Sequence, residues 1–365
     1  MNRTNVKFTS WPVKLSSNMF VGFLLLNHVP VEGAAKFGWG DAPERDDDLL
    51  ARVCDYFEKR SKEEIYPNSE VWDPIVATHA DFVKLLRDRD YEKLHEYISM
   101  MFTKNITSGT AQGTFYYNQF IKNDGGVRDD AEFTVYDKLI TLLESCNMIP
   151  TFSPEDYLKD QNFLKYFTVD PDKYLSILEE SCNADLCAPK YQGGLFGLKT
   201  EKHGLYCDRD IMCLGVAIRV LEAYNKNRNI SICDIGGGVG HLEYYLSKLG
   251  FTNITMVDLP TVSTTAKYFL ETNLPEKVND INLISPSEFT GEYDLVINFD
   301  GLVTYGKDAA KEYTDKISKN AKHFISVNKE VEEFRMCDIL NMTRVSRNPF
   351  WHRRGYVEEN YVSSK

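Results

Sequence analysis

The chain has 365 residues, 43% of them hydrophobic and 26% charged, so it can bury a substantial core and is not disordered throughout. Its formal net charge of −12 argues against DNA or RNA as a ligand, because proteins that bind nucleic acids usually present a basic face. No signal peptide is recognisable, and the apolar run Met19–Leu26 is too short to cross a bilayer, so we expect a cytoplasmic protein without a membrane span.

The length suggests two domains, or one domain with a large extension. We expect residues 1–190 to form a mainly helical N-terminal region and residues 191–365 to form a second domain. In the first region, apolar spacing predicts helices over Asp47–Lys62, Val71–Met101 with a break near Asp88–Asp90, Asp129–Cys146 and Pro171–Cys182. Glycine and polar residues predict loops over Lys104–Phe120 and Tyr191–Gly197.

The second region alternates strand and helix patterns. A helix is predicted from Asp208 to about Tyr224, followed by strands at Ile230–Asp234, Ile254–Asp258, Ile281–Ile284, Asp294–Asn298 and His323–Val327. Further helices are predicted over Gly240–Leu249, Ser263–Thr272, Ala309–Asn320 and near Val331–Leu340, and short β segments over Thr343–Ser346 and Tyr356–Val362. This order predicts an α/β fold with a Rossmann-like, doubly wound sheet of seven strands whose last strand is antiparallel.

The cysteines give no sign of a metal or redox site. The eight cysteines include no CxxC pair, and the CxH spacing of a zinc site is absent. Several lie within apolar runs, as Cys213 and Cys233 do. We therefore expect reduced thiols, mostly buried, and no structural metal.

A glycine-rich turn joins the first predicted strand to the next helix. It reads Asp234-Ile235-Gly236-Gly237-Gly238-Val239-Gly240. The glycines let the backbone turn sharply and let a ligand approach without a Cβ in the way. The spacing is GxGxG and not the GxGxxG of a dinucleotide site. Asp234 would oppose a pyrophosphate but suits the amine of S-adenosylmethionine (SAM), so the turn favours SAM over NAD.

A second acid supports a nucleoside ligand. Asp258 ends the next predicted strand, 24 residues after Asp234. An acid at about this separation accepts hydrogen bonds from the ribose hydroxyls of the cofactor. The polar run Ser285–Glu288 follows the third strand, where it could meet the adenine edge.

Three segments should face the transferable methyl group of SAM, because ligands of open α/β sheets bind outside the carboxyl ends of the strands. They are Asn298–Asp300, Asn328–Glu330 and the loop Arg347–Gly355 of the terminal hairpin. That loop gathers cations and aromatic residues in an acidic chain, which suits a phosphate or another anion; its expected acceptor-binding residues are Arg347, Trp351, Arg353 and Arg354. The alternative is a solvated turn packed by Trp351.

Transfer of a methyl group to oxygen needs alignment of the reactants and gains from a base within hydrogen-bond reach of the hydroxyl. Asp300 and His352 are the two candidate bases. A divalent metal that lowers the hydroxyl pKa is an alternative for which Asp300 would be a ligand, but no second ligand has a compelling spacing, so no metal residue is assigned.

The run Asp234–Gly240 resembles motif I of class I SAM-dependent methyltransferases. Together with Tyr293–Asn298, His323–Glu330 and Arg354–Glu359, it is similar to the sugar O-methyltransferases of surface-polysaccharide gene clusters, over roughly residues 190–362. The resemblance implies methylation of a sugar hydroxyl on a nucleotide-sugar, glycan or glycolipid precursor. By position, the cofactor would contact Asp234, Gly236, Gly238, Gly240, Asp258, Leu259, Ser287 and Asn298.

Other hypotheses remain open at the level of the sequence. The acceptor could be a phosphorylated small molecule or a natural product, and a third hypothesis is a protein that keeps the fold for binding without catalysis. The N-terminal region matches no pattern, and we expect it to cover the acceptor site, to mediate formation of a homodimer, or both.

Overall fold

The computed structural model describes residues 35–62, 72–111, 126–151, 169–331 and 334–364, with the side chains of 126–134 left aside. The Met19–Leu26 run and residues 112–120 of the predicted Lys104–Phe120 loop lie outside these ranges. Within them, no helix is both long and apolar enough to cross a membrane.

The predicted seven-stranded sheet is confirmed, with the strand order β6-β5-β4-β7-β8-β10-β9. Strands β4 to β8 are parallel, and β10 runs antiparallel to both of its neighbours. The strands are β4 (Ile232–Ile235), β5 (Ile254–Val257), β6 (Ile281–Ile284), β7 (Tyr293–Phe299), β8 (Ala321–Lys329), β9 (Thr343–Pro349) and β10 (Tyr356–Val362). Because β9 is parallel to β8, the turn of the terminal hairpin lies at the carboxyl edge of the sheet, as the sequence predicts.

Helices cover both faces of this sheet because successive side chains of a strand point to opposite faces. In β4, Ile232 belongs to one hydrophobic cluster and Cys233 to the other. The first cluster includes α11 (Asp208–Ala223), α12 (His241–Lys248) and α13 (Pro260–Asn273), and the second includes α14 (Lys307–Asn320) and α15 (Met336–Ile339). Of the helix predicted near Val331–Leu340, only the four residues of α15 are helical in the described part.

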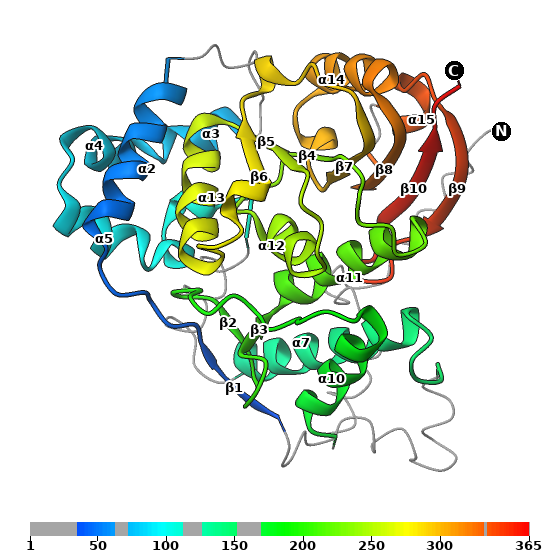
Figure 1. The fold of residues 1–365 in the computed structure, drawn as a ribbon, viewed down its shortest axis with the longest axis horizontal. Helices are drawn as coiled ribbons and strands as arrows, with labels where there is room; N and C mark the ends of the chain where they lie inside the picture. The colour runs from blue at the N-terminus through cyan, green and yellow to red at the C-terminus, as the bar shows by residue number, and fades with distance from the viewer. Residues whose placement is uncertain (1–34, 63–71, 112–125, 152–168, 332–333, 365) are drawn as a thin grey trace.

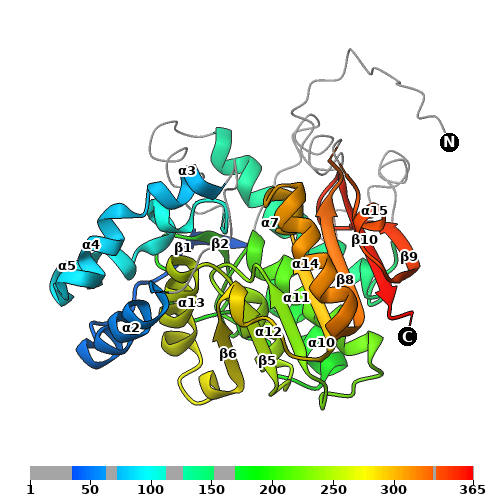
Figure 2. The same ribbon diagram turned by 90° about the horizontal axis from the view of Figure 1, so that it is seen from above.

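The N-terminal region packs against α11 and α13, the helices that cover the first of these faces of the sheet (Figures 1 and 2). Its helices are α2 (Asp47–Arg60), α3 (Trp72–Ala77), α4 (Ala80–Asp88), α5 (Tyr91–Ile98), α7 (Gly126–Ser145) and α10 (Pro171–Cys182). The predicted break near Asp88–Asp90 falls between α4 and α5, where Arg89 has a φ of 52°. Short 3-10 helices are η1 (Met101–Thr103), η2 (Asn105–Thr107), η3 (Val278–Asp280), η4 (Pro286–Glu288) and η5 (Leu302–Thr304).

A second, small sheet was not predicted from the sequence. It contains β1 (Lys36–Trp39), β2 (Phe196–Lys199) and β3 (Leu205–Cys207), all antiparallel. The pairing of β1 with β2 joins residues on either side of the proposed boundary at residue 190. The core cluster around α11 also includes buried residues of α2, α4 and α5, such as Leu50, Phe82 and Leu94. The division at residue 190 therefore stays a prediction.

Candidate functional site

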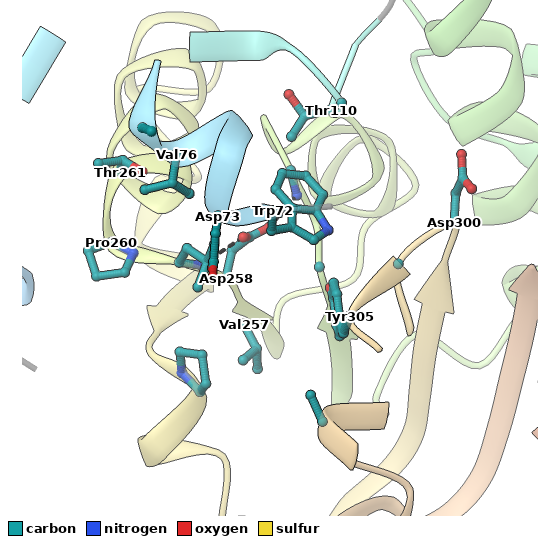
Figure 3. A pocket seen from close by; sticks show the side chains of 18 of the residues that line it. Trp72, Asp73, Val76, Thr110, Val257, Asp258, Pro260, Thr261, Asp300 and Tyr305 are labelled. Carbon is teal, nitrogen blue, oxygen red and sulfur yellow. Dashed lines mark hydrogen bonds between the residues drawn. The ribbon is translucent and has the colours of Figure 1, made fainter. Parts of the chain in front are cut away.

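A cavity of about 520 Å³ lies at the carboxyl edge of the large sheet (Figure 3). Its volume falls in the range of roughly 300–1,000 Å³ that is usual for small-molecule sites. The lining follows the ends of four neighbouring strands, with Pro286 after β6, Asp258 after β5, Gly236 after β4 and Asp300 after β7. This is the place where ligands bind in open α/β sheets.

The turn after β4 has the backbone conformation that its glycines predict. Gly236, Gly238 and Gly240 have φ values of 78°, 67° and 95°, which residues with a side chain rarely adopt. Gly236 and Gly238 line the cavity, and a Cβ on Gly236 would come within 2.2 Å of the hydroxyl of Tyr305. Gly240 instead precedes α12 and lies against Leu270. The turn therefore needs glycine both for its conformation and for its close contacts.

Asp258 is fixed beside this turn. Its carboxylate accepts hydrogen bonds from the backbone N–H of Gly238 (2.8 Å) and of Leu259 (2.7 Å), and Asp258 and Leu259 both line the cavity. These bonds favour the charged form. Burial opposes them more strongly, and with the nearby charge of Asp234 it raises the pKa of Asp258 to about 7.

Asp234, the predicted partner of a ligand amine, lies outside the cavity lining. It is 2% exposed and its side chain interacts with that of Glu243, which is fully buried near Gly237. Burial raises the pKa of Asp234 to about 6 and the pKa of Glu243 further still. Two buried carboxyl groups in contact are most stable when they share a proton. The pair therefore has a structural role beside the glycine turn.

The β7 end of the cavity holds a cation that the sequence analysis missed. Arg209, in the first turn of α11, lines the cavity with its guanidinium 5.0 Å from the centre of the Phe299 ring. Within the described part of the chain this guanidinium has no hydrogen bond or ion pair. Burial works against its charge, but nearby acids including Asp300 and Asp234 leave the pKa of Arg209 raised. A cation at a helix N-terminus is unfavourable for the helix dipole, and this is the sequence signal that could have found it.

Asp300, one of the two candidate bases, lines the cavity at the same end. It has a φ of 60°, an uncommon conformation that for a residue other than glycine is often found at functional sites. Its carboxylate accepts hydrogen bonds from the hydroxyl of Tyr356 (2.6 Å) and from Arg353 (3.1 Å), whose guanidinium lies over the Tyr356 ring. The terminal hairpin therefore holds Asp300 in position.

The other candidate base, His352, is placed elsewhere. It is 4% exposed and does not line the cavity. Its Nε2 lies 3.2 Å from the carboxylate of Asp208, which Lys138 of α7 also contacts at 2.5 Å. Burial lowers the pKa of His352 despite this carboxylate. His352 therefore lies outside the cavity and connects the hairpin to Asp208 of α11, and its role as a base stays a prediction.

Most of the predicted acceptor-binding loop also turns away from the cavity. Arg347 of β9 pairs with Glu330, which directly follows β8 (2.9 Å), and with Glu359 of the neighbouring strand β10 (3.6 Å). Trp351 packs against Gly215 of α11, and Arg354 is exposed. Of the four predicted residues, only Arg353 contacts a side chain of the cavity, that of Asp300.

Two predicted cofactor residues have supporting positions. Asn298 is fully buried and donates a hydrogen bond to the backbone carbonyl of Ile235 (2.7 Å), while its own oxygen accepts from the N–H of Leu302 (3.0 Å). The Ser287 hydroxyl contacts the Ser285 hydroxyl at 3.0 Å. Neither Asn298 nor Ser287 lines the cavity.

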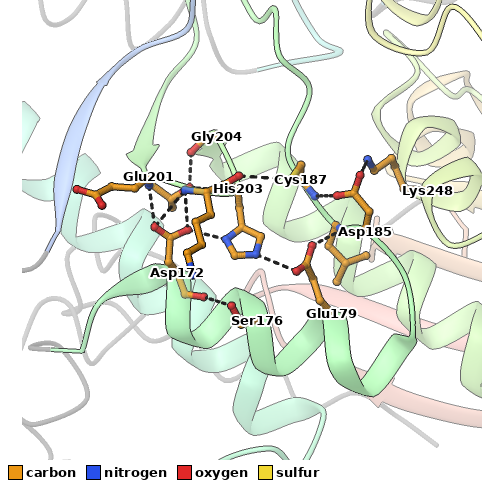
Figure 4. Close-up of polar contacts among 12 residues, drawn as sticks. Asp172, Ser176, Glu179, Asp185, Cys187, Glu201, His203, Gly204 and Lys248 are labelled. Carbon is orange, nitrogen blue, oxygen red and sulfur yellow. Dashed lines mark hydrogen bonds and ion pairs between the residues drawn. The ribbon is translucent and has the colours of Figure 1, made fainter.

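A polar cluster lies apart from the cavity, between α10 and the loop before β3 (Figure 4). His203 is 2% exposed; its Nδ1 lies 2.5 Å from Asp172 and its Nε2 lies 3.1 Å from Glu179. Asp172 also accepts hydrogen bonds from the backbone N–H groups of Glu201 and Lys202. Burial tends to raise the pKa of Asp172, but the bonds from His203, Glu201 and Lys202 outweigh it and the pKa is lowered.

The eight cysteines are all free thiols, as predicted. In the described ranges, two groups of side chains have the spacing of metal ligands: Cys207 with Asp210 and His241, and Glu179 with Asp185 and Cys187. Neither group lines the cavity. Asp210 accepts hydrogen bonds from Gln192 and Tyr245, and Asp185 pairs with Lys248, so these acids already have partners.

No protein-family model and no curated protein matches this chain. Among solved structures, one similar chain is the magnesium protoporphyrin IX methyltransferase of Synechocystis with bound S-adenosylhomocysteine (SAH), at 17% identity and a TM-score of 0.37, covering 43% of this chain and 84% of that one. Another is the glycopeptide N-methyltransferase MtfA complexed with SAH, at 10% identity and a TM-score of 0.35, covering 41% and 90%. Likenesses at this level say nothing of what this chain acts on.

Replacing Asp172 by Ala should destabilise the protein by about 2–4 kcal/mol, because it leaves the Nδ1 atom of buried His203 and two backbone N–H groups without their acceptor. Urea denaturation measures this loss. Asp315, in an exposed pair with Lys311, provides the control: its replacement by Ala should change stability by less than about 0.5 kcal/mol. Equal losses in the two variants would contradict a structural role for the cluster.

The variant His352→Gln should lower the free energy of unfolding by about 1–3 kcal/mol, because the ring contacts buried Asp208. The exposed neighbour Arg354, replaced by Gln, should change it by less than about 0.5 kcal/mol. Thermal or urea unfolding of both variants makes the comparison. A stability equal to that of the wild type in the His352 variant would remove its anchoring role.

Proposed function

We propose that the chain is a SAM-dependent O-methyltransferase and that its acceptor is a sugar hydroxyl in a nucleotide-sugar, glycan or glycolipid precursor. The observation that carries the proposal is the order of groups along the cavity. An apolar section, an acid beside the glycine turn and the half-buried cation of Arg209 follow one another from β6 to β7.

This order fits the parts of SAM. The apolar section suits adenine, Asp258 suits the ribose hydroxyls as a hydrogen-bond acceptor, and Arg209 suits the carboxylate of the methionyl part. Gly236 and Gly238 line the cavity and carry no Cβ, so their backbone is accessible to a cofactor that lies against the turn. When bound, the cofactor supplies an electrophilic methyl group.

The same residues disfavour a dinucleotide. A pyrophosphate would lie against the turn and the start of α12. Beneath this turn are the buried acids Asp234 and Glu243, and Asp258 lies beside it. The acids would repel a doubly negative group, whereas the positively charged sulfonium and amine of SAM gain from them.

Asp300 is the remaining candidate for the base. A carboxylate oxygen has two lone pairs, so the bonds from Tyr356 and Arg353 leave acceptor capacity for a hydroxyl of the acceptor. Asp300 lies at the same end of the cavity as Arg209 and Phe299, where the methyl group of a cofactor in the proposed orientation would be. Arg353 and Tyr356 act on the reaction only by positioning Asp300.

The acceptor is proposed as a sugar from the resemblance of the strand-end motifs. A phosphorylated acceptor is less well supported, because Arg347 and Arg353 of the hairpin already pair with the acids Glu330 and Asp300. The loop therefore offers less free positive charge than its sequence suggests.

A methyl-transfer screen with labelled SAM against nucleotide-sugars and deacylated glycans, with magnesium or EDTA, tests the activity. We expect transfer to a sugar hydroxyl, and a loss in kcat of about 100-fold or more in Asp300→Asn, because a positioned base contributes at least this much. SAH affinity should change less than about twofold in that variant. Transfer to phenolic acceptors alone would contradict the sugar, and unchanged turnover would remove Asp300 from the mechanism.

The affinity for SAH should increase with pH. The pKa of Asp258 is near 7, so at pH 6 the carboxyl group is mostly protonated and is a poorer acceptor for the ribose hydroxyls. If only the ionised form binds, the dissociation constant falls about tenfold between pH 6 and pH 8. Calorimetry at several pH values measures it. Asp258→Asn should bind weakly with a flat profile, and the same slope in that variant would assign the titration to another group.

A further inference from the structure

We propose that helices α2, α3 and α4 complete the binding site for the adenosyl half of the cofactor, with Trp72 and Asp73 as cofactor-binding residues. The acceptor then enters at the opposite end of the cavity. This inference rests on the proposed function and replaces the expectation that the N-terminal region covers the acceptor.

The two ends of the cavity differ in chemistry. Near the ends of β5 and β6, the lining residues are the apolar Val257, Leu259, Pro260 and Pro286. Asp258 is the one charged residue that these two strand ends contribute to the lining. Near β7 it comes from Arg209, Phe299 and Asp300. Adenine has apolar faces and the methionyl end carries two charges, so the cofactor fits in one direction, with adenine toward β6.

The N-terminal helices contribute to the adenine end and its neighbourhood. Phe57 of α2 and Ser61, which directly follows this helix, line the cavity. Val83 and Arg87 of α4 line it as well. The side chains of α3 that line the cavity include Trp72, Asp73 and Val76, and Figure 3 shows α3 above Asp258. Asp73 thus adds a second carboxylate to the part of the cavity where the ribose hydroxyls would lie.

These helices are firmly attached to the sheet domain around the adenine end. Arg60, 7% exposed, donates a hydrogen bond to the carbonyl of Leu283 at the end of β6 (2.6 Å) and pairs with Glu288 of η4. His79 contacts the hydroxyl of Thr261 at 3.1 Å. Helix α2 also packs along α13, so the N-terminal helices have a fixed position next to the strand ends that bind adenine.

Trp72 lines the cavity and connects α3 to the segment after β7. Its indole N–H donates a hydrogen bond to the hydroxyl of Thr304 in η5, after β7, at 2.8 Å. The other end of the indole lies near Gly109, where a Cβ would be 3.3 Å from the ring. The neighbouring Thr110 approaches Gly238 of the glycine turn. The indole therefore lies near the glycine turn, where its aromatic face can cover the adenosyl group.

Two ligands that share the adenosyl group separate the halves of the site. SAH has the adenosyl group and the amino-acid end, whereas 5′-methylthioadenosine (MTA) has the adenosyl group and lacks the amine and carboxylate. Calorimetry of both ligands with the full chain is carried out for the wild type, Trp72→Ala, Trp72→Phe and Arg209→Gln.

We expect Trp72→Ala to weaken SAH and MTA by the same factor, about fivefold or more, because aromatic stacking on a base contributes at least about 1 kcal/mol. Trp72→Phe keeps one aromatic ring but loses the bond to Thr304 and part of the ring area, so its losses should be smaller than those of Trp72→Ala for both ligands. Arg209→Gln should weaken SAH about tenfold or more and change MTA less than about twofold, because MTA has no carboxylate.

Two outcomes would overturn the inference. One is a loss of SAH affinity in Trp72→Ala with MTA affinity unchanged, and the other is wild-type protein that binds SAH but not MTA. A wild type that binds neither ligand contradicts the proposed function itself. If Trp72→Ala does not fold, Val76→Met adds volume at a half-buried position of the cavity lining, and it must weaken the binding of both ligands equally.

Discussion

The side chain of Asn298 is the contact on which the whole strand edge depends. From the end of β7 it donates to the last carbonyl of β4 and accepts from the N–H of Leu302 and from the amide of Asn328 on β8 (2.9 Å). A buried amide with three partners fixes the relative height of three strand ends. The glycine turn begins directly after one of these contacts and η5 at another, so the turn, Tyr305 and the Thr304 hydroxyl that binds Trp72 are all positioned by this one residue.

Periodicity and turn chemistry were enough to predict the large sheet. Strands alternating with helices specify parallel strands, and the final hairpin follows from two short β segments around a glycine-containing loop. The small sheet was not predicted, because β1 and β2 have four residues each and lie about 160 residues apart, so neither strand has a local partner in the sequence. Long-range pairing of short strands leaves no periodic signal to detect.

The candidate site was predictable in part for a related reason. Gly236, Gly238 and Asp258 occupy the positions that a strand-turn-helix pattern assigns to them, since their neighbours in sequence are also their neighbours in space. Arg209 and Trp72 reach the cavity from helices outside that pattern. Charge in the sequence does not show ion pairing: Arg347 of the hairpin looks available, but folding places Glu330 and Glu359 beside it. The position of His352 was not predictable either, because it is buried against Asp208, a residue far away in the sequence.

The pairing of β1 with β2 has a consequence for the synthesis of the protein. Lys36 pairs with Lys199, so the first described strand finds its partner only after more than 160 further residues have left the ribosome. Helix α2, which follows β1, packs on α13, which is made later still. The apolar faces of the N-terminal helices therefore wait for their partners while the chain grows, which is the situation in which nascent chains rely on chaperones.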